Sequence, residues 1–236
     1  MSIVLPVYNE AGSVAHVVSE WMATVDRLGI LYEFLVLDDG STDDTQAALG
    51  SLAARHPHLR VLRHANIGHG PTILRGFTES RGDWVFQIDS DGEIGPAGFD
   101  DMWRHREGFD LLLGDRISRS APLVRQVITA VSRASVRLLF GRGIHDVNVP
   151  YRLMRGPLLR ELAAALPPNL FAPNVILSGL AIRRQLRIYQ TPVQHVGRQH
   201  GQSSLGRFSV LRPAARSLWQ TGLIAWRDRA GSRRRG

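Results

Sequence analysis

Short apolar runs alternate with amphipathic stretches over the first 115 residues, and this alternation limits the fold more than any other feature. The apolar runs read SIVLPV, FLVLD, RVLRH, DWVFQID and DLLLGD, and the amphipathic stretches cover residues 13–28, 42–55, 69–81 and 96–105. Strand-length runs separated by helical patterns indicate a largely parallel sheet covered by helices. The sequence therefore predicts an α/β fold.

Beyond residue 115 the alternation fades. Residues 122–140 read as an arginine-studded helix and residues 187–196 as a last strand. The uncharged run 162–182 has the length of a membrane span, but three prolines and two asparagines interrupt it. Two buried helices joined by a proline turn are the better interpretation of this run.

Polar clusters follow three of the strand-like runs: YNE at 8–10, DDGS at 38–41 and DSD at 89–91. The ligand crevice of an open α/β sheet lies beyond the carboxyl ends of its strands, so we expect the clusters to share one edge. A nucleotide would give these carboxylates separate tasks at base, ribose and a metal-bound pyrophosphate. The GSTDDT segment also offers Ser41 or Thr42 as the N-cap of the following helix.

Asp89, Asp91 and Glu93 place three carboxylates at alternate positions behind a strand. They face one side only while the chain stays extended, and Gly92 can end that conformation. An Asp-x-Asp at a strand end supplies hard oxygen ligands for Mg²⁺ or Mn²⁺, ions that usually keep waters and bind substrate phosphates as well. Aspartates at strand ends also cap helices and solvate turns, so the motif alone leaves both interpretations open.

Charge is divided unevenly along the chain. Residues 1–100 hold 14 Asp and Glu against six Arg, a net charge of −8, whereas the remainder holds 23 Arg against seven acids, a net charge of +16. This division suggests that one half binds a cation or a metal-bound ligand and the other binds anions such as phosphates, nucleic acid or an acidic membrane. The absence of cysteine excludes disulfides, thiolate metal sites and a cysteine nucleophile.

Four stretches, SIVLPVYNEAGSV, FLVLDDGSTDDT, ANIGHGPTILRGF and WVFQIDSDGE, occur in an order and spacing that resemble the nucleotide-sugar domain of glycosyltransferase family 2. Farther along, RQVITAVSRASVRLLFG, HDVNVPYRLMR and GRQHGQSSL are similar to polyprenyl-phosphate glycosyltransferases, including dolichyl-phosphate mannose synthase-like enzymes. The resemblance covers residues 2 to about 205. It implies the GT-A fold, a Rossmann-like, mixed and mostly parallel sheet flanked by helices.

The resemblance also implies a domain organisation. Residues 1–200 would form the catalytic domain, with a nucleotide-sugar-binding half at 1–115 and an acceptor-binding half at 116–200. Beyond the resemblance, the composition of residues 201–236 predicts a basic amphipathic C-terminal segment, with a disordered tail after Gly231.

Site residues follow from the resemblance position by position. The residues implied for the nucleotide sugar are Pro6, Tyr8, Glu10, Asp38, Asp39, Asn66, Gly68, Asp89, Ser90 and Asp91. Those implied for Mg²⁺ or Mn²⁺ are Asp89, Asp91 and Glu93, and those for the acceptor phosphate are Arg116, Arg125, Thr129, Arg133 and Arg198. The catalytic group would be Asp91, Arg116, Asp146 and Arg152. His69 and Pro71 depart from the family's residues, which leaves the role of their loop in donor binding open. Asn148, Pro150 and Arg133 depart from the dolichyl-type branch, which leaves the identity of the sugar open.

The nature of the acceptor depends on whether a base is present. A hydroxyl acceptor needs a carboxylate to take its proton, and relatives with such acceptors usually show an ED pair in the second half, which this chain lacks. A lipid monophosphate is already ionised and is held by arginines. Asp146 is therefore either a base for a hydroxyl acceptor or a structural residue that orients Arg152 or its loop. His195 and His200 are expected to be surface or loop histidines.

The last 39 residues hold nine Arg and one Asp, interleaved with Trp219, Trp226 and aliphatic side chains. Such a segment is typical of a helix lying on an anionic membrane surface, and the alternative is an ordinary amphipathic helix packed on the domain. The chain opens directly into a strand-like run, without the pattern of a signal peptide. We expect a cytoplasmic protein in peripheral contact with the inner face of the membrane, directly or through a separate membrane partner.

Together, the residues and the resemblance predict an inverting, metal-dependent transfer of sugar from a nucleotide-diphosphate sugar to a polyprenyl phosphate. The alternative within enzymes is transfer to a glycan or other hydroxyl in cell-envelope polysaccharide synthesis. The isoelectric point near 11.1 also raises nucleic-acid binding. The acidic ligand edge and the lack of an RNA-binding signature argue against nucleic acid as a partner.

Overall fold

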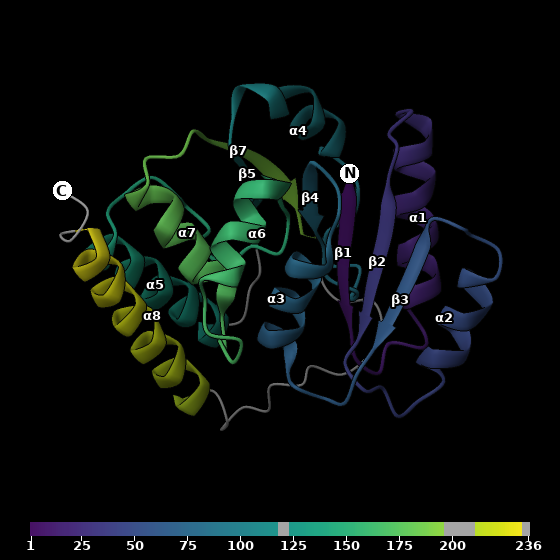
Figure 1. Ribbon diagram of the computed structural model, residues 1–236, viewed down its shortest axis with the longest axis horizontal. Coiled ribbons are helices and arrows are strands. Elements are labelled where there is room, and N and C mark those ends of the chain that lie inside the picture. Colours follow the sequence, from purple (N-terminus) through teal and green to yellow (C-terminus); the bar gives the residue numbers. More distant parts are fainter. Residues whose placement is uncertain (118–122, 196–210, 233–236) are drawn as a thin grey trace.

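A seven-stranded sheet lies at the centre of the computed structural model, which describes residues 1–117, 123–195 and 211–232 (Figure 1). The strands are β1 (Ser2–Val7), β2 (Glu33–Asp38), β3 (Leu59–Arg63), β4 (Trp84–Gln87), β5 (Leu111–Ile117), β6 (Arg152–Arg155) and β7 (Ile188–Gln194). Their order is β3-β2-β1-β4-β6-β5-β7, and only β6 runs antiparallel to its neighbours. The predicted mixed, mostly parallel sheet is confirmed.

Eight α-helices and a 3-10 turn are assigned in the described part of the chain. They are α1 (Val14–Arg27), α2 (Thr45–Ala53), α3 (His69–Glu79), α4 (Phe99–His105), η1 (Arg106–Gly108), α5 (Leu123–Leu139), α6 (Gly156–Ala164), α7 (Pro173–Arg183) and α8 (Leu211–Ser232). The uncharged run 162–182 forms the end of α6, a connection and most of α7, as predicted. Arg125 lies in α5 but its side chain is outside the described part, and Arg198, His200 and residues 233–236 lie outside it altogether.

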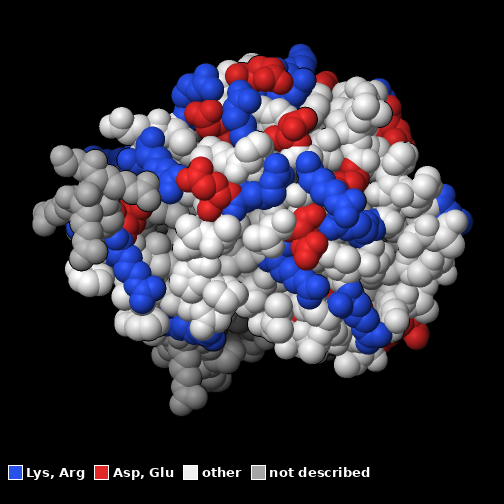
Figure 2. Space-filling model, in the orientation of Figure 1, with Lys and Arg blue, Asp and Glu red and all other residues white. Residues whose placement is uncertain are grey.

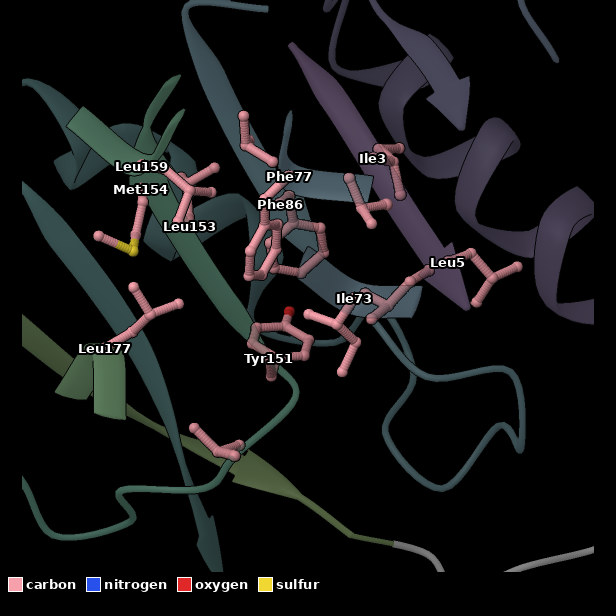
Figure 3. Packing of buried hydrophobic residues seen from close by; sticks show 14 of the residues in the cluster. Ile3, Leu5, Ile73, Phe77, Phe86, Tyr151, Leu153, Met154, Leu159 and Leu177 are labelled. Atoms are coloured by element: carbon pink, nitrogen blue, oxygen red, sulfur yellow. The ribbon is translucent and has the colours of Figure 1, made fainter. Parts of the chain in front are cut away.

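Helices cover both faces of the sheet. On one face Trp21 of α1 packs against Phe86 of β4, Phe99 of α4 and Tyr151, with ring centroids 5.1, 5.5 and 5.8 Å apart. On the other face α3 lies against β1 and β2 and is joined by α6 and α7 (Figure 1). Figure 3 shows buried side chains of both layers, with Phe86 and Tyr151 from the sheet and its preceding loop and with Ile73, Phe77, Leu159 and Leu177 from α3, α6 and α7.

The first turn of α2 differs from the prediction. Neither Ser41 nor Thr42 caps this helix, which begins at Thr45. The hydroxyl of Ser41 instead accepts the backbone N–H of Asn9 at 3.0 Å, and the Asp43 carboxylate accepts the backbone N–H of Thr45 at 3.0 Å. The DDGS segment is therefore used to join the ends of β1 and β2, because Ser41 is engaged with the neighbouring strand.

The reversed strand β6 decides what lies at the carboxyl edge of the sheet. Arg152, the first residue of β6, pairs with Gln87 at the end of β4 and with Leu113 of β5. The loop that leads into β6 therefore reaches the same edge as the carboxyl ends of the parallel strands. Side chains from the second half of the chain are thereby brought beside the acidic clusters of the first half.

The C-terminal helix α8 packs on the domain through α5 and α7. Arg183 of α7 links the three helices, since its guanidinium donates to the carbonyl of Leu139, the carbonyl of Ala225 and the carboxylate of Asp228. None of the helices in the described ranges is both long and apolar enough to cross a membrane. Figure 2 shows arginines and acidic residues interspersed over the face that α3 and α6 cover.

Candidate functional site

Asp39 joins two loops at the carboxyl edge. Its carboxylate accepts the backbone N–H groups of Ile67 at 2.7 Å and Gly68 at 3.0 Å. Gly40, with φ of 72°, lets the loops approach closely, since a Cβ there would lie 2.7 Å from the backbone nitrogen of Asn66. Asn66 and Gly68, both predicted site residues, are thereby held beside Asp39, and Asn66 stays exposed.

Asp38 ends β2 as a buried carboxylate beside two donors. It accepts the backbone N–H of Ser41 at 2.9 Å and lies 3.4 Å from the guanidinium of Arg63. Its Oδ2 accepts no hydrogen bond from the described residues. Pro6 is also buried, within β1 and next to β2 in the sheet.

The cluster after β1 combines an exposed ring with a buried acid. Tyr8 is 44% exposed. Glu10 is buried, with its carboxylate accepting the hydroxyl of Ser13 at 2.7 Å and its backbone N–H donating to the hydroxyl of Thr45 at 2.8 Å. Tyr8 is thus free to meet a ligand, while Glu10 is fixed at the start of α1.

Asp89 is a largely buried carboxylate in acidic surroundings. Its Oδ1 accepts no hydrogen bond from the described residues and lies 3.8 Å from Nε2 of His69. Burial, with a smaller effect from the charges of Asp91 and Glu93, raises the pKa of Asp89 to about 6 against the lowering effect of His69 and Arg116. Ser90 is buried between the two aspartates. A cation at this turn would relieve the repulsion.

Glu93 turns toward β7. Its carboxylate lies 2.6 Å from Nε2 of His195, the residue directly after β7, and both side chains are mostly buried. His195 therefore lies in the loop after β7, as expected, but its ring is enclosed beside Glu93 and does not lie at the surface. Among the residues that the structure describes, no three histidine, aspartate or glutamate side chains form a metal-binding group.

Arg116 and Asp146 form a close pair from the second half of the chain. The guanidinium donates to both carboxylate oxygens, from Nε at 2.6 Å and from Nη2 at 3.1 Å. Burial lowers the pKa of Arg116, but the bonds to Asp146 and the charges of Asp89 and Glu93 raise it overall. Arg116 thus stays charged beside the acidic turn, and Asp146 orients Arg116 rather than Arg152.

Arg152 is enclosed at the start of β6. It is 1% exposed, and its guanidinium donates to the carbonyls of Val147, Val149 and Asn174. These bonds hold the loop before β6 against α7, which is a structural role. The catalytic role that the resemblance implies for Arg152 stays a prediction.

The charges around the acidic turn do not balance. Four carboxylates, those of Asp89, Asp91, Glu93 and Asp146, act on one another there, together with the guanidiniums of Arg116 and Arg152 and the imidazole of His69. Carboxylates predominate in this group, which favours a bound cation. Asp89 and Asp91 offer the hard oxygen ligands that Mg²⁺ and Mn²⁺ prefer, and two carboxylates suffice where phosphates complete the shell.

Helix α5 carries the remaining candidates. Thr129 and Arg133 are half-buried, and the Nε of Arg133 has no hydrogen-bond partner among the described residues. A hollow of about 530 Å³ lies along this helix, with arginines beside a small apolar floor. Its lining includes Ala130, Arg133, Ala134, Arg137, Leu138 and Arg142. Such a surface can take an anionic group with an apolar chain.

Sequence reasoning did not identify the partners that hold the site together. His195, Arg63 and Ser178 lie far in sequence from the groups that they contact and are brought to them by the fold, so no local pattern marks them. His69 stood out in the sequence only as a departure from the resemblance. Its position beside Asp89 is set by the N-terminus of α3.

Comparison with known families gives one match, residues 2–155 with the family described as "Glycosyl transferase family 2". Among curated proteins, an undecaprenyl-phosphate 4-deoxy-4-formamido-L-arabinose transferase from Edwardsiella ictaluri is 28% identical over 215 residues, covering 89% of this chain and 64% of that protein. The same transferase from Salmonella enteritidis is 27% identical over 215 residues, covering 90% of this chain and 63% of its own. The chain thus spans under two thirds of these relatives.

Solved structures with the same architecture include glucosyl-3-phosphoglycerate synthase from Mycobacterium tuberculosis. Its complex with Mn²⁺, uridine-diphosphate-glucose and phosphoglyceric acid has a TM-score of 0.67 at 22% identity, covering 94% of this chain and 79% of that chain. Its complex with phosphoglyceric acid has a TM-score of 0.68 at 22% identity, covering 93% and 78%. At this identity the likeness establishes a GT-A-like fold.

Proposed function

This chain belongs to glycosyl transferase family 2, and from that membership we propose that it moves a sugar, with inversion, from a nucleotide-diphosphate sugar to a polyprenyl phosphate. In this proposal residues 1–115 bind the donor and residues 116–200 bind the acceptor. The curated relatives named above act on undecaprenyl phosphate, which supports a lipid acceptor of this class.

The pairing of Arg116 with Asp146 carries the proposal. A hydroxyl acceptor would need a carboxylate base, yet both oxygens of Asp146 accept bonds from Arg116. A phosphate acceptor is already ionised at neutral pH and needs a guanidinium to hold and align it. The pair therefore favours a phosphate over a sugar hydroxyl as the nucleophile.

The first half offers a set of contacts for the donor. The exposed ring of Tyr8 can lie against a planar base, and the buried carboxylate of Asp38 has an oxygen left to accept a base or ribose donor. Asp39 holds the loop of Asn66 and Gly68, whose backbone lines the same edge. We assign the nucleotide to this part of the edge.

Asp89 and Asp91 are the residues that would hold Mg²⁺ or Mn²⁺. When bound, the ion neutralises the diphosphate as it leaves the anomeric carbon. Arg116 aligns the acceptor phosphate beside the acidic turn, which turns the reaction between two bound substrates into an effectively unimolecular step. No side chain has to remove a proton from this acceptor.

An exposed apolar and basic surface on α5 and α8 supports contact with a membrane, from which a lipid acceptor would come. On α8, Trp219 and Trp226 are each 67% exposed, whereas Ile224 and Ala225 on the opposite side are buried. Arginines flank the two tryptophans, and the arginine-lined hollow lies along α5. Tryptophan with arginine is the composition of a helix at an anionic interface. We propose peripheral contact with the cytoplasmic face.

The acceptor assay tests this proposal. Purified protein with Mn²⁺ and a panel of UDP-, GDP- and dTDP-sugars is offered undecaprenyl phosphate or a soluble glycan. We expect one labelled sugar to be transferred to the lipid and none to the glycan. Asp91→Asn should abolish both this transfer and the Mn²⁺-dependent rise in Tm caused by the donor. Labelling of the glycan alone would contradict the lipid acceptor, and an unchanged Mn²⁺ effect would contradict the metal assignment.

A further inference from the structure

Arg152 is a buried cation whose bonds connect three elements. Its Nε and Nη2 donate to the carbonyl of Val149 at 3.2 and 3.1 Å, and Nη2 also reaches the carbonyl of Val147 at 3.4 Å. Nη1 donates to the carbonyl of Asn174 at 3.3 Å, and Nη2 lies 3.5 Å from the hydroxyl of Ser178. One side chain thus joins β6 to the preceding loop and to α7.

Burying the charge of Arg152 costs free energy. Burial lowers the pKa of Arg152 to about 9, while the charges of Asp146 and Asp89 raise it, so the group is charged at neutral pH. Enclosing a cation without a hydrogen-bonded carboxylate is costly, and carbonyl oxygens compensate only in part. An apolar side chain would fill this space at a lower cost in free energy. The role of Arg152 must therefore lie in its hydrogen bonds.

The bonds fix the turn 146–149. The carbonyl of Val147 accepts both Arg152 and the hydroxyl of Ser178, the latter at 2.8 Å. Within the turn, the backbone N–H of Asn148 donates to the Asp146 carboxylate at 3.3 Å. The turn therefore sets the position of the Asp146 carboxylate, and Arg152 of β6 and Ser178 of α7 hold the turn in place.

Asp146 in turn holds Arg116 through two bonds of 2.6 and 3.1 Å. We infer that Arg152 is a positioning residue: it fixes the turn 146–149, the turn fixes Asp146, and Asp146 aligns Arg116 beside the acidic turn. Ser178 supports the same turn from α7. The catalytic consequence rests on the proposed function, but the positioning of Arg116 does not.

Arg152→Lys tests the inference by keeping the charge and removing the branched set of donors. We expect kcat/KM for the lipid acceptor to fall about tenfold, with a smaller fall for Ser178→Ala, because Arg116 is less well aligned. The Kd for donor with Mn²⁺, measured by calorimetry, should stay within about twofold of the wild type. A tenfold higher Kd for the donor would show that Arg152 acts on the diphosphate and would overturn the inference.

A double-variant cycle tests the route through Asp146. Once Asp146→Asn has weakened the hold on Arg116, adding Arg152→Lys should cost little more, because both changes act on one contact. Fully additive losses would contradict the route. Arg155→Lys is the matched control, since Arg155 lies on the same strand with its ion pairs to Glu107 and Asp110 at the surface. It should leave the acceptor parameters unchanged.

A measurement that needs no turnover separates the two proposals. The Nε–H of Arg116 is bonded to Asp146, so its hydrogen exchange by NMR should be slow in the wild type and faster in Arg152→Lys and Ser178→Ala. Equal exchange in all three proteins would refute the positioning role. If Arg152→Lys does not fold, Ser178→Ala still decides the question. If the Nε–H of Arg116 exchanges slowly in the wild type and faster in the variants, but no sugar is transferred to the lipid, only the proposed function is refuted.

Discussion

Asp89 keeps a carboxylate where burial and two neighbouring acids disfavour its charge. Its pKa of about 6 in the folded protein exceeds the ordinary value of 3.8, so the folded state binds more protons than the unfolded state between these pH values. Stability therefore falls as pH rises through this window and stays lower above it. At pH 7.5, without divalent ions, Asp89→Asn should raise the free energy of unfolding by about 1–3 kcal/mol in a urea titration.

Asp43→Asn is the control for Asp89→Asn, because it should change the free energy of unfolding in the opposite direction. Asp43 has a lowered pKa, because hydrogen bonds from Thr45 and Ala11 outweigh its partial burial, so its charge stabilises the folded state at neutral pH. Asp43→Asn should lower stability at pH 7.5. At pH 3.5 Asp89→Asn should match the wild type, and a gain that persists there would contradict the electrostatic explanation.

At this scale, residue type and order predicted which acids lie at the edge, but not what each one touches. The three clusters do meet at one edge of the sheet, as strand polarity required. Asp146 was expected to be a base or to orient Arg152 or its loop; in the structure it accepts the backbone N–H of Asn148 within that loop and also binds Arg116 of β5, a partner that was not expected. Such contacts between distant segments leave no local signature, and Ser41 was misassigned as a cap for the same reason.

The packing of α3 against the loop after α6 gives a prediction for a whole element. A Cβ on Gly70 would lie 2.0 Å from the carbonyl oxygen of Leu170, so Gly70→Ala forces the N-terminus of α3 away from that loop. We expect a loss of about 3 kcal/mol in free energy of unfolding. Donor binding should also weaken, because Gly68 and His69 lie at this end of the helix.

Gly50 provides the matched substitution. It lies inside α2 with nothing within 4 Å of an added Cβ, so Gly50→Ala should stabilise the protein by up to about 1 kcal/mol through helix propensity. Chemical denaturation of both variants measures the two effects. Equal midpoints for the two variants would contradict the close approach at Gly70.

Most elements and the parallel direction of most strands could be predicted from periodicity, but the reversed strand could not. The strand-like runs marked β1, β2, β3, β4, β5 and β7 to within a few residues, because buried strands are short and flanked by polar turns. Strand β6 was missed, since RLMR is brief and carries arginine at both ends. Its antiparallel direction depends on the path of the chain after α5, about which side-chain pattern says nothing.

The exposed tryptophans of α8 give a prediction for the intact protein. Replacing Trp219 and Trp226 with alanine should reduce binding to vesicles containing anionic lipid by at least about tenfold in a sedimentation assay, since both indoles would leave the interface. Folding should be unaffected, because both side chains are 67% exposed. Raising the salt concentration should weaken the wild type as well, because the flanking arginines contribute through charge.

Leu31→Ala is the control for this experiment, because Leu31 is 91% exposed beside the start of β2, away from α8. It should bind vesicles like the wild type. Equal loss from Leu31→Ala would show non-specific adsorption. Undiminished binding of the double tryptophan variant would contradict the assignment of this surface and leave the acceptor assay unaffected.

The reversed strand also governs the order in which the protein can be built. Strands β1 to β4 are completed by residue 87, yet one side of β4 has no partner until Arg152–Arg155 is inserted between it and β5. An unpaired strand edge of apolar residues is a site of intermolecular pairing. Strand β6 covers this edge slowly, because the long stretch of chain between β4 and β6 must first close into a loop. The first half of the chain, made alone, should therefore aggregate. In the whole chain, the late insertion of β6 both covers the open side of β4 and brings the loop before β6 to the acidic edge of the sheet.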